Sequence, residues 1–142
     1  MLRLKPVVLD TNLVVSAFIQ PHGTAAQALG IALREFDVVM AEATLAELAD
    51  VLSRDKFDRY LDRAVRRQLL ADYAEAARAV AVTQSVTDCR DPRDNKFLAL
   101  ALSAGARLIV SGDRRDLRSM SPWRGVEIVG VRAFVEGWEA WR

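Results

Sequence analysis

Two apolar runs that each end in an aspartate constrain the fold of this chain more than any other feature. The first is Val7-Val8-Leu9-Asp10 and the second is Leu108-Ile109-Val110-Ser111-Gly112-Asp113. A continuous apolar run without polar alternation is typical of a strand that is buried on both faces, as in parallel sheets. Open α/β folds place their ligand sites at the carboxyl edge of such strands. We therefore expect Asp10 and Asp113 to lie at a common functional edge.

The remaining patterns alternate between strand and helix. They predict strands at residues 6–10, 37–41, 107–111 and 126–129, and helices at residues 13–19, 25–35, 44–54, 63–79, 91–104 and 132–141. Residues 80–82 fit either a strand or the frayed end of the preceding helix, and residues 114–124 fit a polar loop. Strands that alternate with helices imply a parallel sheet with helices on both faces. A chain of 142 residues can bury a sizeable core, so we expect one domain over residues 1–142.

Composition excludes several classes of protein. The formal net charge of +1 gives no strong attraction to nucleic acid or to a membrane. Cys89 is the only cysteine, so no internal disulfide can form, which suits a reducing cytosol and a cytoplasmic protein. His22 is the only histidine, so a zinc site built from His and Cys is nearly excluded. The N-terminus has no signal-peptide pattern and no run reaches membrane-spanning length, so we expect no membrane partner.

Four acidic residues stand at equivalent places in the predicted elements. Asp10 and Asp113 end strands, and Glu47 and Asp94 lie in the first turns of helices. If they converge, two like charges at ~4 Å repel by roughly 4 kcal/mol at an effective dielectric near 20. A divalent cation with oxygen ligands relieves this repulsion, and Mg²⁺ and Mn²⁺ suit carboxylates and water. Together the four acids favour a metal site.

Each acid also has a purely structural interpretation. Asp10 could cap the turn that follows its strand. Thr44-Leu45-Ala46-Glu47 fits a capping box, in which Glu47 reaches back to the amide of the cap residue. Asp94 gains from the helix dipole, although an acid that leads a buried helical face is costly unless it is paired or bound to metal. The combination is therefore more informative than any single acid.

The segment after the second aspartate-ended strand is rich in charge. Asp113 could be a turn residue, and Asp116 is a rival for its role. Arg114 and Arg115, with Arg118 and Arg124 further on, could contact phosphate groups of RNA beside the acids. A solvated loop explains these arginines equally well.

These residues resemble the motifs of the PIN-domain family, most closely its branch of toxins from toxin–antitoxin pairs. The similar segments are Val8-Leu9-Asp10-Thr11-Asn12 with Ser16, residues 45–57, Asp91-Pro92-Arg93-Asp94-Asn95-Lys96-Phe97 with the apolar run behind it, and Ile109-Val110-Ser111-Gly112-Asp113. The resemblance covers residues 7–117 in the order of the family. Asn95 stands where many relatives carry another acid, and Ser111 stands where Thr is more usual.

The resemblance implies a three-layer α/β/α sandwich with a central, mostly parallel sheet. It also implies a Mg²⁺- or Mn²⁺-dependent endoribonuclease that hydrolyses phosphodiester bonds of single-stranded RNA. The catalytic acids would be Asp10, Glu47, Asp94 and Asp113, of which Asp10, Asp94 and Asp113 would hold metal and Glu47 would orient the attacking water. Supporting polar residues would be Thr11, Asn12, Ser16 and Ser111. Partners would be an antitoxin protein and a second copy of the chain.

Several helical faces can be assigned from their spacing. Residues 65, 69, 76 and 80 form the expected apolar stripe of the helix over 63–79, and Arg63, Arg66 and Arg67 its solvated face. Val131, Phe134, Val135 and Trp138 follow the i, i+3, i+4, i+7 spacing of a core face. Trp123 and Trp141 are harder to bury and could lie at a dimer or antitoxin interface.

Other functional classes fit the residues less well. Aspartyl phosphotransfer of the haloacid-dehalogenase type needs a second Asp two residues after the nucleophile, where this chain has Asn12. A dinucleotide enzyme needs a glycine-rich turn after the first strand, where this chain has Thr11-Asn12-Leu13. A non-catalytic PIN-like domain that binds RNA or a protein partner is the remaining alternative.

Overall fold

The computed structural model describes residues 3–142. Met1 and Leu2 lie outside the described residues. They belong to the expected domain of residues 1–142 and to the stretch expected to carry no signal peptide. The strands are β1 (Pro6–Leu9), β2 (Asp37–Met40), β3 (Arg78–Ala79), β4 (Leu108–Ser111) and β5 (Glu127–Gly130). They form one sheet in the order β3-β2-β1-β4-β5, and every neighbouring pair is parallel. The predicted parallel sheet is confirmed.

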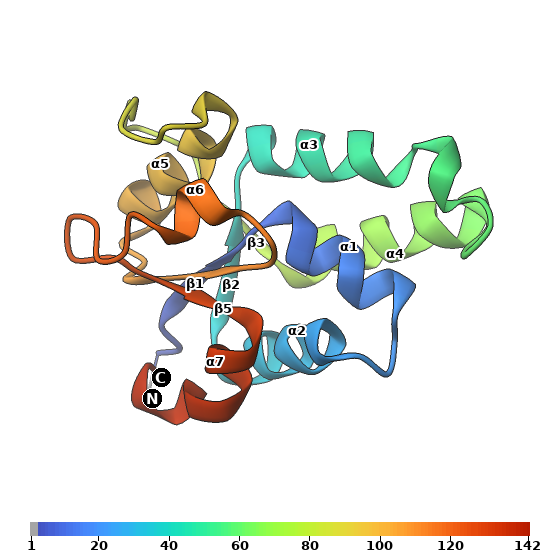
Figure 1. The fold of residues 1–142 in the computed structure, drawn as a ribbon, viewed down its shortest axis with the longest axis horizontal. Helices are drawn as coiled ribbons and strands as arrows, with labels where there is room; N and C mark the ends of the chain where they lie inside the picture. The colour runs from blue at the N-terminus through green and yellow to red at the C-terminus, as the bar shows by residue number, and fades with distance from the viewer. Residues whose placement is uncertain (1–2) are drawn as a thin grey trace.

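Alternating side chains along the central strands build two cores, one on each face of the sheet. Val7 and Leu9 of β1 belong to a cluster with side chains of α1 (Thr11–Ile19), α2 (Thr24–Glu35) and α7 (Val131–Gly137). Val8, between them, belongs to a second cluster that contains most of α5 (Asn95–Ala104) and Leu117 of the short α6 (Arg115–Arg118). Figure 1 shows α2 and α7 on one side of the sheet and α5 and α6 on the other. The three-layer α/β/α sandwich is therefore confirmed.

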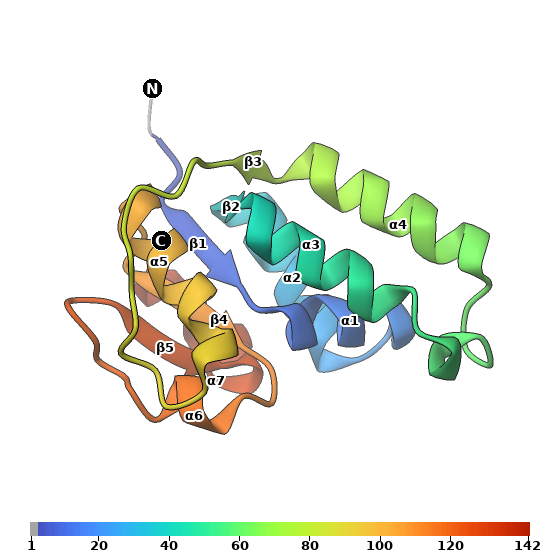
Figure 2. The same cartoon turned by 90° about the horizontal axis from the view of Figure 1, so that it is seen from above.

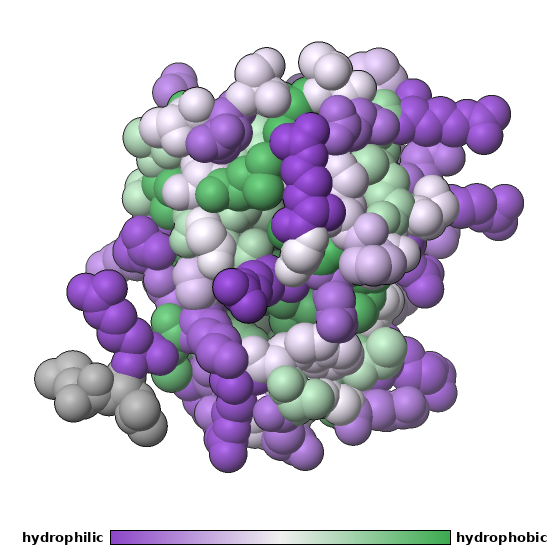
Figure 3. Space-filling model, turned by 90° about the vertical axis from the view of Figure 1, so that its left-hand side faces the viewer, coloured by the Kyte–Doolittle hydropathy of each residue, from purple (hydrophilic) through white to green (hydrophobic). Residues whose placement is uncertain are grey.

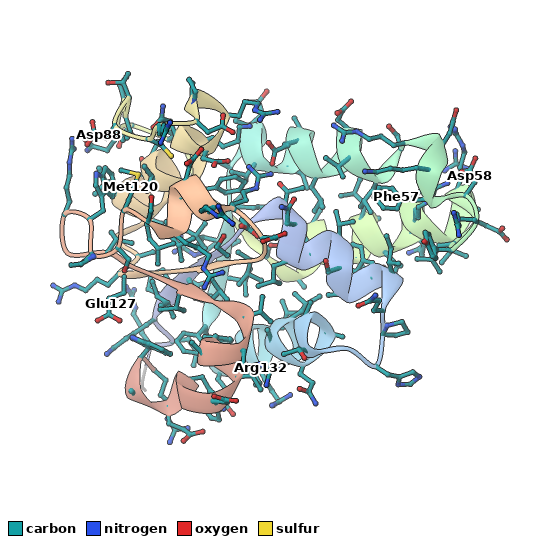
Figure 4. All side chains as sticks on the ribbon, in the orientation of Figure 1. Phe57, Asp58, Asp88, Met120, Glu127 and Arg132 are labelled. Atoms are coloured by element: carbon teal, nitrogen blue, oxygen red, sulfur yellow. The ribbon has the colours of Figure 1, made fainter. Side chains whose placement is uncertain are left out.

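Two long helices extend beyond the sheet. α3 (Glu42–Leu52) and α4 (Arg63–Ala76) run side by side in both views of the ribbon and are joined through the 3₁₀ turn η1 (Asp55–Phe57) (Figures 1 and 2). We call residues 42–76 the α3–α4 arm. Figure 4 shows Phe57 and Asp58 near its tip.

The buried face of α4 differs from the predicted one. Arg66, expected on a solvated face, is only 2% exposed. Its guanidinium donates to the carbonyl oxygens of Leu52 (2.8 Å) and Arg54 (2.9 Å) and forms an ion pair with Asp58. Val65, expected in the apolar stripe, is exposed instead. The carbonyl of Leu52, the last residue of α3, lacks an intrahelical donor. A guanidinium with five N–H groups can satisfy it and also reach the carbonyl of Arg54 beyond the helix, which an apolar side chain cannot.

Two predicted element boundaries are wrong. α3 begins at Glu42 behind Ala41, and Thr44 is its third residue, whose hydroxyl accepts from the Ala41 N–H at 2.9 Å. α4 ends at Ala76, and the chain then pairs with β2 as β3, extended by a 2.8 Å bond from the amide of Val80 to the carbonyl of Met40. The edge strand thus lies at 78–79 and not at 80–82, because pairing with the sheet outweighs the local helical pattern.

Three further segments differ from expectation. The predicted helix at 91–104 opens with the 3₁₀ turn η2 (Pro92–Asp94) before α5, although Asp91 caps that turn as expected, accepting from the amide of Arg93 at 3.0 Å. The polar stretch 114–124 contains α6, which is held down by the fully buried Leu117. The C-terminal helix is divided into α7 and the 3₁₀ turn η3 (Trp138–Ala140).

The C-terminal aromatic side chains pack against the chain itself. Phe134 is fully buried, which confirms the predicted core face of α7. Trp123 is buried and its indole N–H donates to Asp88 at 3.0 Å, so its expected place at an interface is wrong. Trp141 stacks on Phe134, with ring centroids 6.4 Å apart, and donates to Glu127 at 2.7 Å.

The surface of the described residues is largely hydrophilic on the face shown in Figure 3, which corresponds to the left-hand side of Figure 1, with smaller hydrophobic areas between the polar side chains. Within residues 3–142, no helix combines the length and the apolar character needed to cross a bilayer.

Candidate active site

The sheet order creates a crevice at the carboxyl ends of β1 and β4. These two strands are neighbours, but the chain leaves them in opposite directions. From β1 it continues to β2, towards one edge of the sheet, and from β4 it continues to β5, towards the other edge. Ligand sites of open α/β sheets lie at such a switch point. A cleft of about 790 Å³ lies here, with α1, α3 and η1 along one side and η2, α5 and α6 along the other.

Asp10 joins the ends of β1 and β4 and is buried beneath this crevice. The carboxylate is fully buried; it caps α1 by accepting from the amide of Leu13 (3.0 Å), and it accepts from the Ser111 hydroxyl (2.5 Å) and the Gly112 amide (2.9 Å). Burial raises the pKa of Asp10, and the hydrogen bonds from Ser111 and Gly112 oppose this only in part. The expected cap and the expected position at the sheet edge are therefore both present.

Gly112 allows this close approach of α1 to the end of β4. A Cβ atom at this position would lie 2.9 Å from both the Cβ of Asn12 and the backbone nitrogen of Leu13. Because part of the obstruction is backbone, it cannot move as the end of a flexible side chain could. Only glycine lets the amide at this position reach the carboxylate of Asp10.

Arg114 brings the buried acids to a common point. Its guanidinium forms ion pairs with Asp94 and with Glu47 (2.8 Å), and its Nε lies 4.0 Å from Asp10. The guanidinium also lies over the ring of Phe97, 4.9 Å from the centroid. The side chain is 14% exposed, so the pairs are largely screened from water. These pairs raise the pKa of Arg114 above its ordinary value despite burial.

Glu47 faces the other acids and does not cap its own helix. Its carboxylate accepts from the hydroxyl of Thr11, from Lys96 (2.8 Å) and from Arg114. Burial tends to raise the pKa of Glu47, but the hydrogen bonds from Lys96 and Thr11 and the charge of Arg114 outweigh it, so the pKa is lowered. The predicted capping box between Thr44 and Glu47 is wrong. The N-cap of α3 is Ala41, and the hydroxyl of Thr44, not the carboxylate of Glu47, accepts from the amide of that cap residue.

The other predicted site residues lie along the cleft. Asn12, Ser16, Asp113 and Arg115 line it, as does Asp116, the rival of Asp113. Asp113 is exposed and, within residues 3–142, takes no part in the ion pairs around Arg114. The structure thus brings together Asp10, Glu47 and Asp94, and leaves Asp113 at the wall of the cleft.

The carboxylates fit a hard divalent cation in their chemistry. Asp10, Glu47 and Asp94 all face one guanidinium, so together they already stabilise one positive charge. Carboxylate oxygens are the ligands that Mg²⁺ and Mn²⁺ prefer. Within residues 3–142, no three Asp, Glu, His or Cys side chains are yet close enough to enclose an ion. The acids would therefore have to close around a metal.

Sequence patterns missed two contacts of the site. Lys96 forms an ion pair with Glu47. The sequence indicates this role only weakly, because Lys96 is a single cation in front of the apolar run of α5. Asn95, which stands where relatives carry an acid, accepts from the amide of Cys89 at 2.8 Å and so ties down the loop before η2. Nothing local in the sequence indicates that partner.

Comparison with known proteins identifies the family. The family model of the PIN domain matches residues 6–115. The chain belongs to the PIN domain family. It is also 30% identical over 116 residues to the uncharacterized protein MJ1680 of Methanocaldococcus jannaschii, and the match covers 80% of this chain and 74% of that protein.

Solved structures share the fold at low sequence identity. PAE2754 from Pyrobaculum aerophilum superposes with a TM-score of 0.64 at 15% identity, covering 96% of this chain and 90% of that one. VapBC2 from Rickettsia felis, bound to a DNA fragment from its promoter, gives 0.61 at 12% identity, with 88% and 98% covered. DNA-bound VapBC from Salmonella typhimurium gives 0.59 at 15%, with 92% and 99% covered.

Proposed function

We propose that this protein is a Mg²⁺- or Mn²⁺-dependent endoribonuclease that hydrolyses phosphodiester bonds of single-stranded RNA. One observation carries the proposal: Asp10, Glu47 and Asp94 come from three separate segments and face a single cation at the switch point of the sheet. Assembling three carboxylates is costly unless a cation is part of their function. Membership of the PIN domain family supports the same chemistry.

Each acid has a proposed role. Asp10 and Asp94 hold the metal ion, and Asp113 joins them from the wall of the cleft, directly or through water. Glu47, oriented by Thr11, accepts a hydrogen bond from the attacking water and aligns it. The bound ion supplies an activated water and stabilises the charge that develops on the phosphodiester. Ser111 and Gly112 fix the orientation of the Asp10 carboxylate.

The net charge of +1 gives the whole chain little attraction for RNA, but the charges within the cleft are arranged in a way that suits an RNA backbone. Six acidic and six basic side chains line it. Asp94 is buried and Glu47 half-buried, while Arg115, Arg93, Lys56 and Arg54 are exposed along the sides of the cleft. Exposed cations can hold the phosphates on either side of the cleaved bond, since phosphate contacts position a nucleic acid without reading its sequence. Asn12 and Ser16 would add neutral donors.

The biological setting is also a proposal. The similar fold of the VapBC structures and the resemblance to toxins support a role as the toxin of a toxin–antitoxin pair, in the cytoplasm, with an antitoxin partner and a homodimeric state. A second function is a non-catalytic domain that binds RNA or a protein. The observation that favours it is that Arg114 neutralises two of the acids within the chain itself.

Cleavage of a mixed-sequence single-stranded RNA separates these functions. The assay compares Mg²⁺, Mn²⁺ and EDTA for the wild type, Asp10→Asn, Asp94→Asn and the control Asp72→Asn, which changes an exposed acid bonded to Gln68 on α4. We expect metal-dependent cutting by wild type and control, and at least about a hundredfold loss in both site variants. Cutting by a site variant at the wild-type rate would refute the proposed centre, and no cutting by the wild type would favour the binding function.

A further inference from the structure

The guanidinium of Arg114 lies where the proposed nuclease needs a divalent cation. Its Nη2 is 2.8 Å from Glu47 and its Nη1 is paired with Asp94, while its Nε is 4.0 Å from Asp10. Thus one side chain of this protein contacts or approaches three of the carboxylates that would hold or serve the metal. The ring of Phe97 supports the guanidinium from one face.

Arg114 and a metal ion cannot use these oxygens at the same time. Mg²⁺ binds carboxylate oxygens at about 2.0–2.1 Å. An ion at that distance from the Glu47 and Asp94 oxygens would lie against the guanidinium nitrogens that now contact the same atoms. Two cations in contact repel strongly, more so where water is largely excluded. The cluster can therefore accept one of them at a time.

Lys96 does not compete in the same way. Its ammonium contacts Oε1 of Glu47, whereas Arg114 contacts Oε2 of the same carboxylate. Lys96 can therefore stay in place and hold the orientation of Glu47 while the other oxygen changes partner. Among the described side chains at this cluster, only Arg114 bridges two of the acids.

We propose that Arg114 is a tethered counter-ion that a divalent metal must displace, so that the exchange of Arg114 for metal sets the metal affinity of this site. The inference rests on the proposed nuclease function. Arg114 is thus a positioning residue: in the metal-free protein it holds Glu47 and Asp94 together. After the exchange its guanidinium lies free in the cleft beside Arg115, where a phosphate oxygen is a suitable acceptor.

Direct titration of the metal-free protein with Mn²⁺ by calorimetry tests this exchange. The matched pair is Arg114→Gln and Arg115→Gln, because both remove one positive charge from the same cleft and only the first removes the bridge. We expect Arg114→Gln to bind Mn²⁺ about tenfold more tightly or better, the equivalent of one charged hydrogen bond, and Arg115→Gln to change affinity by less than about threefold. Arg114→Lys, which keeps the charge but cannot bridge, should fall between.

A second measurement guards against misfolding of the glutamine variant. Free guanidinium ion can take the place of the missing side chain in Arg114→Ala. In that variant, a low, non-denaturing concentration of guanidinium chloride should therefore weaken Mn²⁺ binding more than the same concentration of sodium chloride. In the wild type, the two salts should weaken Mn²⁺ binding equally. Equal affinities in the Arg114 and Arg115 variants, or weaker binding after loss of Arg114, would overturn the exchange and leave the nuclease proposal intact. Absence of Mn²⁺ binding in every folded protein would overturn the metal site itself.

Discussion

Replacement of Arg66 by methionine should destabilise the protein although it places an apolar side chain in a buried position. Arg66 is 2% exposed and ties α4 to the end of α3 through two carbonyl oxygens, at 2.8 and 2.9 Å. Methionine has a similar length but no donor. The carbonyls of Leu52 and Arg54 would then lose their charged partner at the negative end of the α3 dipole.

The magnitude can be bounded from the contacts. Each hydrogen bond from a charged donor contributes about 1.5–3 kcal/mol. The pair with Asp58 adds at most about 1 kcal/mol, because that carboxylate is 52% exposed. Against this, Nε of Arg66 is buried without a partner, and removal of the guanidinium recovers its desolvation cost. We expect a net loss of about 2–3 kcal/mol.

Urea denaturation followed by far-UV circular dichroism measures this loss. The control is Arg67→Met, an exposed neighbour on the same helix, which should change stability by less than about 0.5 kcal/mol. A loss of 2–3 kcal/mol corresponds to a fall in Tm of roughly 6–12 °C for a chain of this size. If both variants are equally stable, the desolvation cost of Arg66 cancels its hydrogen bonds and the reasoning fails.

Other contacts lead to three further expected outcomes. Burial raises the pKa of Asp10, so its ionisation costs stability as the pH rises through the folded-state pKa. Metal-free Asp10→Asn should therefore be more stable than the wild type at pH 7 in thermal denaturation with EDTA, and this difference should shrink as the pH falls. Gly112→Ala places a Cβ 2.9 Å from the Leu13 nitrogen and should cost about 1–3 kcal/mol in urea, and unchanged stability would contradict the close packing. Trp123→Phe removes the bond to Asp88 and should cost about 1 kcal/mol by the same assay, whereas no loss would show that this bond contributes nothing.

The parts of the fold that depend on local pattern could be predicted from the sequence. The runs that end at Asp10 and Ser111 form adjacent central strands, because an unbroken apolar run has few other places in an α/β protein. Gly105 ends α5 with φ of 68°, as its position after the apolar run indicates. The convergence of Asp10 and Glu47 also follows, because α3 comes directly after β2 and therefore begins at the same edge of the sheet.

The errors arose where distant partners decide the structure. Nothing in the local sequence distinguishes Arg66 from a solvated arginine, because its partner, the carbonyl of Leu52 at the end of α3, is brought to it only by the packing of α4 against α3. Thr44 and Glu47 match a capping box locally, yet Glu47 finds Thr11, Lys96 and Arg114 across the cleft instead. Such contacts join residues far apart in the chain, and hydrophobic periodicity carries no information about them.

The central proposal is that a divalent ion held by the acids at this sheet edge acts directly on the phosphodiester. Single-turnover cleavage of an RNA with one phosphorothioate linkage at the cleaved position tests it, because Mg²⁺ binds sulfur poorly and the softer Mn²⁺ binds it better. We expect slow cleavage in Mg²⁺, recovery in Mn²⁺, and no recovery in Asp94→Asn. Equal rates for the oxygen and sulfur substrates in Mg²⁺, unchanged by Mn²⁺, would contradict direct metal contact at the cleaved bond.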